Sequence, residues 1–318
     1  MISAPAVPIT NIRPLTRSSR AIIRVVCYYG MFKYPVKAVE IKKNLSVKIS
    51  DQELNEELEL LVDQKLLSRR GRFFWIGTDE ELVVRRLQGN LRARKFMRKA
   101  RAIGSRVSKF PFVKGIYISG SLSKGYIDDE GDIDYFVITS PNRLWLTKGL
   151  LALIKKVFLL NSKKYFCFNY FIDDRSLKIP DENLFTAVEL TTLIPIYNSG
   201  LYHEMVKKNP WALELMPNFK PEGATLSSTV KEPKTKIIWE KRLGGVVGNS
   251  LELLSMKTYE GFWRLKYGRG LKNKADVRIR CEKNVSKVHP NNFQVKVLAR
   301  LEEEYAKFEQ KYKLSITD

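Results

Sequence analysis

Residues 115–139 contain "GIYISGSLSKGYIDDEGDIDYFVIT", in which two apolar, strand-like runs flank a Gly-Ser turn. The second run carries aspartates at alternate positions, Asp132 and Asp134. Residues alternate faces along a strand, so the pattern predicts both carboxylates on one face of a sheet. Carboxylates this close repel each other unless a cation neutralises them, and Mg²⁺ prefers such oxygen ligands. The alternative interpretation is an edge strand that ends in solvated aspartates.

The turn before the aspartates favours the metal interpretation. Gly120 permits a close approach of the backbone, and Ser121 follows at the expected start of a short helix. Free N–H groups and a hydroxyl at such a position can hold phosphate oxygens. Lys124 adds a positive charge nearby. We therefore expect Gly120, Ser121 and Lys124 to bind a triphosphate.

This spacing resembles the signature of the DNA polymerase β-like nucleotidyltransferase superfamily, in which Gly-Ser precedes an Asp-x-Asp/Glu strand after about ten residues. The resemblance is specific over residues 112–139 and looser to about residue 174. It implies a small mixed sheet with flanking helices and two Mg²⁺ ions. It also implies transfer of a nucleoside monophosphate from a nucleoside triphosphate, with Asp132 and Asp134 as catalytic metal ligands. The whole order of elements is similar to that of uncharacterised bacterial and archaeal nucleotidyltransferase-domain proteins.

At the position of the third metal ligand, this sequence departs from the pattern of the family. Active members usually place a third carboxylate on the strand that follows the next helix. Here that strand is expected in "KYFCFNYFIDD", residues 164–174, whose central polar residue is Asn169. We expect Asn169 at the third position, with transfer that is slow or requires Mn²⁺, because an amide brings no negative charge. Asp173, at the end of the strand, is the alternative third acid.

The composition limits the chemistry and the partners. Among 318 residues, 56 Lys and Arg against 34 acids give a net charge of +22, which favours polyanionic partners. Three dispersed cysteines and two histidines argue against a disulfide framework or a thiolate zinc site, so a catalytic metal would need oxygen ligands. The most apolar stretch, residues 144–160, contains three lysines and is expected to be an amphipathic helix. We expect a cytoplasmic protein without a membrane partner.

Turn and capping signals divide the chain into an α+β arrangement of domains. A small mixed-sheet nucleotidyltransferase core is expected between a winged-helix-like domain and a helical C-terminal domain. The expected boundaries are a disordered lead-in at 1–17, the winged-helix-like domain at 18–88, the core at 89–178 and the helical domain at 179–318.

The distribution of charge indicates where nucleic acid could bind. The third helix of the winged-helix-like domain, near residues 51–63, is rich in Asp and Glu, so we do not expect sequence-specific DNA binding. RNA or another polyanion is expected on residues 264–280 and on the basic helix that follows residue 88, which carries Arg92, Arg94, Arg98 and Arg101.

The sequence thus predicts a nucleotidyltransferase with an unidentified acceptor hydroxyl. Two alternatives are a nucleotide-sensing regulator without catalysis and an interaction scaffold with a degenerate core. Lys148 could face the triphosphate, although a lysine on an exposed helix face is the commoner arrangement. Glu189, in an apolar helix, is equally consistent with a paired structural acid and with a catalytic one.

Overall fold

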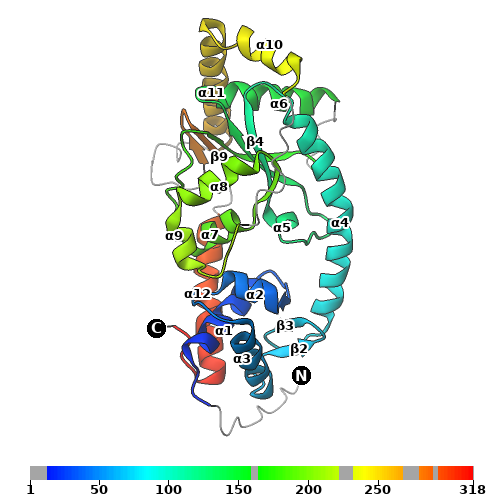
Figure 1. The fold of residues 1–318 in the computed structure, drawn as a ribbon, viewed down its shortest axis with the longest axis vertical. Coiled ribbons are helices and arrows are strands. Elements are labelled where there is room, and N and C mark those ends of the chain that lie inside the picture. The colour runs from blue at the N-terminus through cyan, green and yellow to red at the C-terminus, as the bar shows by residue number, and fades with distance from the viewer. Residues whose placement is uncertain (1–12, 159–163, 222–231, 268–278, 289–292, 318) are drawn as a thin grey trace. The chain divides into compact units, whose positions relative to one another are not determined.

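The computed structural model describes residues 13–158, 164–221, 232–267, 279–288 and 293–317. The chain divides into two compact units (Figure 1). The first comprises residues 1–87, 213–220 and 296–318, and the second comprises residues 88–212 and 221–295. Most of the expected lead-in, residues 1–12, lies outside the described part, and the first helix, α1, begins at Arg17.

The first unit has the predicted order of three helices and a hairpin. Its helices are α1 (Arg17–Gly30), α2 (Ala38–Asn44) and α3 (Asp51–Asp63), and its antiparallel sheet has the order β1 (Val36–Lys37), β3 (Phe73–Trp75), β2 (Ser68–Arg70). The N-terminus of α3 is capped by Ser50, whose hydroxyl accepts a hydrogen bond from the backbone N–H of Glu53 at 3.1 Å. Most of α12 (Phe293–Tyr312) also belongs to this unit.

The second unit is built on a six-stranded mixed sheet. Its order is β7 (Ile194–Tyr197), β4 (Val113–Ser119), β5 (Asp134–Thr139), β6 (Cys167–Asp173), β9 (Val285–Val288), β8 (Ile279–Cys281). The β5–β6 pair is parallel and is connected through α6 (Leu144–Phe158), whereas the other described pairs are antiparallel. The mixed α+β class predicted from the sequence is therefore confirmed.

Each face of this sheet packs differently. One face buries Val137 and Phe171 against α6 and the second half of α4 (Glu81–Val107). The opposite face carries Asp134 and Phe136. It is approached by α7 (Leu184–Thr191), which contains Glu189, and by α8 (Ser199–Lys207), which contains Tyr202. Alternation along β5 thus separates the apolar core from the side that bears the carboxylates.

The C-terminal region contains strands that the sequence interpretation did not include. Residues 179–318 were expected to form a helical domain, yet they supply β7, β8 and β9 to the sheet. Within this region α7 ends at Thr191, and the apolar stretch Ile194–Tyr197 that follows pairs with β4. Pro195 is compatible with this strand because β7 lies at the edge of the sheet. None of the helices in the described ranges is long and apolar enough to cross a membrane.

Candidate metal and nucleotide site

The site begins at the turn between β4 and α5 (Gly120–Ser123). Gly120 adopts φ +67°, which a residue with a side chain rarely adopts. The strand β5 starts at Asp134, directly opposite Ser119 at the end of β4. A Cβ atom at residue 120 would overlap Oδ2 of Asp134. The glycine therefore allows the turn to lie against the carboxylate of Asp134.

Three potential metal ligands meet at this turn. One ligand atom from each of Asp132, Asp134 and Cys167 lies within 4.8 Å of the others, and all three residues are half-buried. Cys167 stands opposite Asp134 in the parallel pairing of β6 with β5, and its side chain forms a hydrogen bond with the Asp134 carboxyl group. The predicted carboxylate pair is thus present, and a thiol joins it.

The electrostatics of Asp134 reflect this crowding. Burial, followed by the negative charges of Asp132 and Glu189, raises the pKa of Asp134 from 3.8 to about 7. The hydrogen bond from Cys167 and the charge of Lys124 oppose the rise only in part. A bound cation would relieve this repulsion and favour the ionised carboxylate.

Lys124 lies beside the turn, but its charge is paired. Its ammonium group donates to Oε1 of Glu189 at 2.7 Å and to the carbonyl oxygen of Gly120 at 3.1 Å. Oε2 of Glu189 accepts from the backbone N–H of Gly120 at 3.3 Å. Glu189 therefore ties α7 to the turn. Ser121, by contrast, is exposed on α5.

The structure pairs Cys167 with Asp134, whereas the predicted third ligand was Asn169, and that assignment stays a prediction. Asn169 lies in β6 where the register shifts between the Tyr135–Phe168 and Phe136–Tyr170 pairs, and its side chain is outside the described part of the structure. Because of this bulge, Cys167 is the β6 residue that faces Asp134.

The alternative third acid is misplaced. Asp173 pairs with Thr139 at the far end of β5, five residues from Asp134, which corresponds to about 16 Å along a strand. Asp173 is buried there, at 3% exposure, and cannot join Asp132 and Asp134. Neither candidate from the sequence stands where Cys167 stands.

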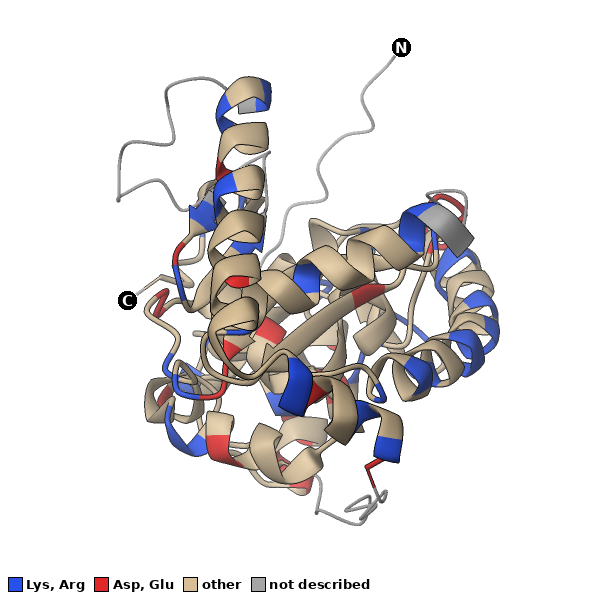
Figure 2. Ribbon diagram, turned by 90° about the horizontal axis from the view of Figure 1, so that it is seen from above, with Lys and Arg blue, Asp and Glu red and all other residues tan. Residues whose placement is uncertain are grey.

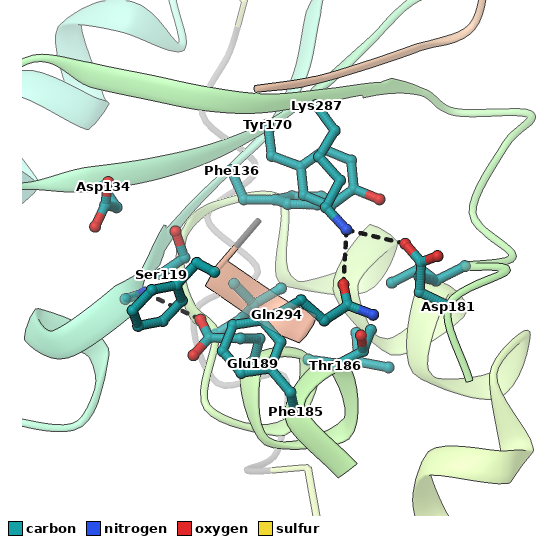
Figure 3. Close-up of a pocket in the computed structure, with 15 residues that line it drawn as sticks. Ser119, Asp134, Phe136, Tyr170, Asp181, Phe185, Thr186, Glu189, Lys287 and Gln294 are labelled. Carbon is teal, nitrogen blue, oxygen red and sulfur yellow. Dashed lines mark hydrogen bonds and ion pairs between the residues drawn. The ribbon is translucent and has the colours of Figure 1, made fainter. Parts of the chain in front are cut away.

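A cavity of about 250 Å³ opens beside Asp134. Ser119, Asp134 and Glu189 line one end, whereas Lys287, Asp181 and Gln294 line the other (Figure 3). Gly120, whose backbone N–H donates to Glu189, also lines the cavity. The rest of the lining is mainly apolar and includes the aromatic side chains of Phe136, Tyr170, Phe185 and Phe293. The carboxylate site therefore lies at one end of a cavity large enough for a small organic group.

A buried ionic network closes the other end of the cavity. The ammonium group of Lys287 donates to Oδ2 of Asp181 and to Oε1 of Gln294, both at 2.9 Å, and Arg280 donates to Oδ1 of Asp181 at 2.8 Å. Burial lowers the pKa of Lys287, although Asp181 opposes the shift. The sequence analysis missed these residues. A lysine within the short apolar strand "VSKV" was the available signal.

Lys148 was expected either to face the triphosphate or to lie on an exposed helix face, and the structure shows neither arrangement. Its side chain is buried, at 7% exposure, and its ammonium group donates to the hydroxyl of Ser286 at 2.5 Å. It packs over the rings of Trp145 and Phe171, which belong to the opposite face of the sheet. Burial lowers the pKa of Lys148 to about 8. Lys148 thus neither faces the solvent nor lines the cavity.

The structure brings together Gly120, Ser121, Lys124, Asp132 and Asp134 at the ends of β4 and β5. Comparisons with protein families, curated proteins and solved structures found no match for this chain. The chemistry of the site is therefore the basis for assigning a function.

Proposed function

We propose that the protein is a nucleotidyltransferase that uses a divalent metal to transfer a nucleoside monophosphate from a nucleoside triphosphate to an acceptor hydroxyl. The observation that carries this proposal is the close approach of Asp132 and Asp134 beside the Gly120 turn, at one end of a cavity of about 250 Å³. Two carboxylates can hold a divalent metal, the glycine turn can approach phosphates, and the adjoining cavity can take an organic group of the nucleotide.

The residues present fit a metal and a triphosphate. Asp132 and Asp134 would hold a divalent cation, which supplies charge neutralisation for the phosphates and acidifies the acceptor hydroxyl. Gly120 allows the backbone to approach the phosphates, and the N–H groups and hydroxyl at Ser121 can donate to their oxygens. Lys124 can add a positive charge once its ammonium group turns from Glu189 towards the triphosphate.

The aromatic cavity suits the nucleoside. Phe136, Tyr170 and Phe185 offer apolar ring surfaces in the cavity that Asp134 also lines, and such surfaces can stack on a base. Thr186 and Gln294 add polar groups that can orient a ligand within the cavity. In this arrangement the triphosphate lies at the Gly120 end and the base points towards Lys287.

The basic half of α4 is the proposed polyanion-binding surface. Between residues 88 and 107 the sequence has no acid, and the exposed cations are Arg94, Lys95, Arg98, Lys99, Arg101 and Arg106 (Figure 2). Arg92 differs, because it is half-buried and pairs with Asp129 at 2.9 Å. Most of the other predicted stretch, 268–278, lies outside the described residues. RNA is the first acceptor to test, because the phosphate groups of RNA bind strongly to a surface of exposed cations.

A nucleotide-sensing function without catalysis is the second candidate. It is favoured by one observation, namely that the third donor at the site is the thiol of Cys167 and not a carboxylate. In that case the protein would bind a triphosphate and its metal but would transfer nothing.

A transfer assay distinguishes these functions. The full-length chain is incubated with each of the four α-labelled triphosphates and a divalent metal, together with RNA, protein or small-molecule extract, and the label and the released pyrophosphate are followed. We expect Asp132→Asn and Asp134→Asn to reduce transfer by at least about a hundredfold. Asp128→Asn, an exposed change in the same loop, is the matched control and should keep full activity. Binding without transfer by the wild type would favour the sensor.

A further inference from the structure

The third donor at the site is a sulfur atom. The Sγ atom of Cys167 and one oxygen each of Asp132 and Asp134 are mutually within 4.8 Å. Cys167 is held there by the pairing of β6 with β5, and the bulge at residue 169 leaves the position facing Asp134 to the thiol. The placement of Cys167 therefore follows from the backbone of the sheet.

Sulfur changes the metal that the site prefers. Mg²⁺ and Mn²⁺ favour oxygen ligands, whereas a thiolate favours softer cations such as Zn²⁺ and Co²⁺. Ligands bound to one zinc ion at about 2.0–2.3 Å are separated by roughly 3–4 Å. The three atoms, within 4.8 Å of each other, can reach that separation through small side-chain rotations.

The number of donors and the cavity indicate the kind of site. Three protein ligands with one open position are typical of catalytic zinc sites, whereas structural zinc sites are closed by four. Asp134 lines the cavity, so a cation held by Asp132, Asp134 and Cys167 would keep an open position on the cavity side. That position would be available to a phosphate oxygen or to a hydroxyl.

We propose that Cys167, together with Asp132 and Asp134, makes this a binding site for a thiophilic divalent cation of the Zn²⁺ class, in preference to Mg²⁺. The inference rests on the proposed function for what the metal does there, but the metal binding itself can be tested without turnover. It also replaces the expectation that a metal would have only oxygen ligands.

Co²⁺ is the probe that reports a thiolate ligand directly. When Co²⁺ is added to chelator-treated full-length protein, we expect a thiolate-to-cobalt charge-transfer band in the near ultraviolet that saturates at a one-to-one ratio. Cys167→Ser should abolish the band. Cys281→Ser is the matched control, because Cys281 lies on β8 near Lys148, and it should leave the band unchanged. Asp132→Asn should weaken Co²⁺ binding by at least about tenfold.

Competition and a rescue variant complete the test. Zn²⁺ should displace Co²⁺ at near-equal concentration, whereas Mg²⁺ in large excess should not. Cys167→Asp should lose the band and gain Mg²⁺ binding, and thermal melting of each variant checks that the fold is kept. The proposal is overturned if the wild type gives no thiolate band, if the band survives in Cys167→Ser, or if excess Mg²⁺ removes it. If the band depends on Cys167 but the protein transfers no nucleotide, the metal site is retained and the proposed enzyme activity is rejected. If Mg²⁺ supports transfer and Cys167→Ser leaves that transfer unchanged, the enzyme activity is retained and the thiophilic metal site is rejected.

Discussion

The carboxylate of Asp134 occupies the space that a side chain at residue 120 would need, because a Cβ atom on Gly120 would overlap its Oδ2 atom. Gly120 also adopts φ +67°. The backbone of the turn and the first carboxylate of β5 are therefore in direct contact. This contact explains why a glycine at the end of one strand and an aspartate at the start of the next form a single site.

Gly120→Ala tests this contact. Gly125 is a matched control, since it has a similar φ of +70° but nothing within 4 Å of its Cβ position. Both variants carry the strain of a left-handed residue, about 1 kcal/mol, but only Gly120→Ala forces Asp134 to move. We expect chemical denaturation to show that Gly120→Ala is less stable than Gly125→Ala by about 1–3 kcal/mol, with loss of metal binding. Equal effects would contradict the close approach.

The ion pair between Lys124 and Glu189 predicts opposite effects of two substitutions. Glu189→Gln removes the charge that neutralises Lys124 at 2.7 Å and one of the charges that raise the pKa of Asp134. Calorimetry should therefore show tighter triphosphate binding by a few-fold, whereas Lys124→Met should weaken binding by about tenfold, which corresponds to about 1.4 kcal/mol. If Glu189→Gln abolishes transfer while binding is kept, Glu189 takes part in the chemistry.

Buried Lys148 predicts a pH dependence of stability. Its pKa is lowered from 10.5 to about 8, so the folded state releases the proton before the unfolded state does. The cost of burying the charge is present below pH 8 and is relieved as the pH rises to 10.5. Relative to Lys148→Met, the wild type should gain up to about 3 kcal/mol of unfolding free energy across this window.

Urea denaturation at several pH values would measure this gain. Lys156→Met, which changes an exposed lysine on the same helix, is the control and should show no such trend relative to the wild type. A constant difference between wild type and Lys148→Met from pH 8 to 10.5 would mean that Lys148 is not a buried cation.

The charge of α4 predicts that a polyanion such as RNA would bind along this helix. Arg94 and Arg98 are exposed, and within the described residues neither forms an ion pair, whereas Arg69 and Arg70 are paired with Glu59 and Glu80. The double change Arg94→Ala/Arg98→Ala should weaken RNA binding and reduce the salt slope by roughly one unit per lost phosphate contact. Arg69→Ala/Arg70→Ala should have a smaller effect. Fluorescence anisotropy over a range of salt concentrations distinguishes the two, and equal losses would refute the assignment to α4.

Local patterns predicted the three strands β4, β5 and β6 but not the strands on either side of them. The strands β4, β5 and β6 follow from apolar runs and turn residues in 112–174, and α6 follows from helical spacing. The strands β7, β8 and β9 were not predicted, because a short strand gains its stability from a neighbour distant in sequence. Ile194–Tyr197 continued the apolar pattern of α7, so periodicity alone gave no boundary.

The parts of the site that lie close together in the sequence were predictable, whereas the parts contributed by distant segments were not. Gly120, Ser121, Asp132 and Asp134 lie within fifteen residues and could be placed from this one stretch of sequence, although β5 begins at Asp134 and Asp132 precedes the strand. Cys167 could not, because alternation assumes an unbroken strand and β6 contains a bulge beside Asn169. Lys287 and Asp181 come together only when β9 joins the sheet.

The most direct test of the central claim is the metal dependence of triphosphate binding to the full-length chain. The probes are the four nucleoside triphosphates with a non-hydrolysable bridge between the α- and β-phosphates, and calorimetry is run with Zn²⁺, Mn²⁺, Mg²⁺ or a chelator. We expect at least one analogue to bind in the presence of a divalent metal and to lose that binding in chelator. The same analogue should bind Asp134→Asn at least about tenfold more weakly than the wild type, whereas its affinity for Asp128→Asn should be unchanged. Failure of all four analogues to bind with any metal, or binding that is indifferent to both chelator and Asp134→Asn, would contradict the account.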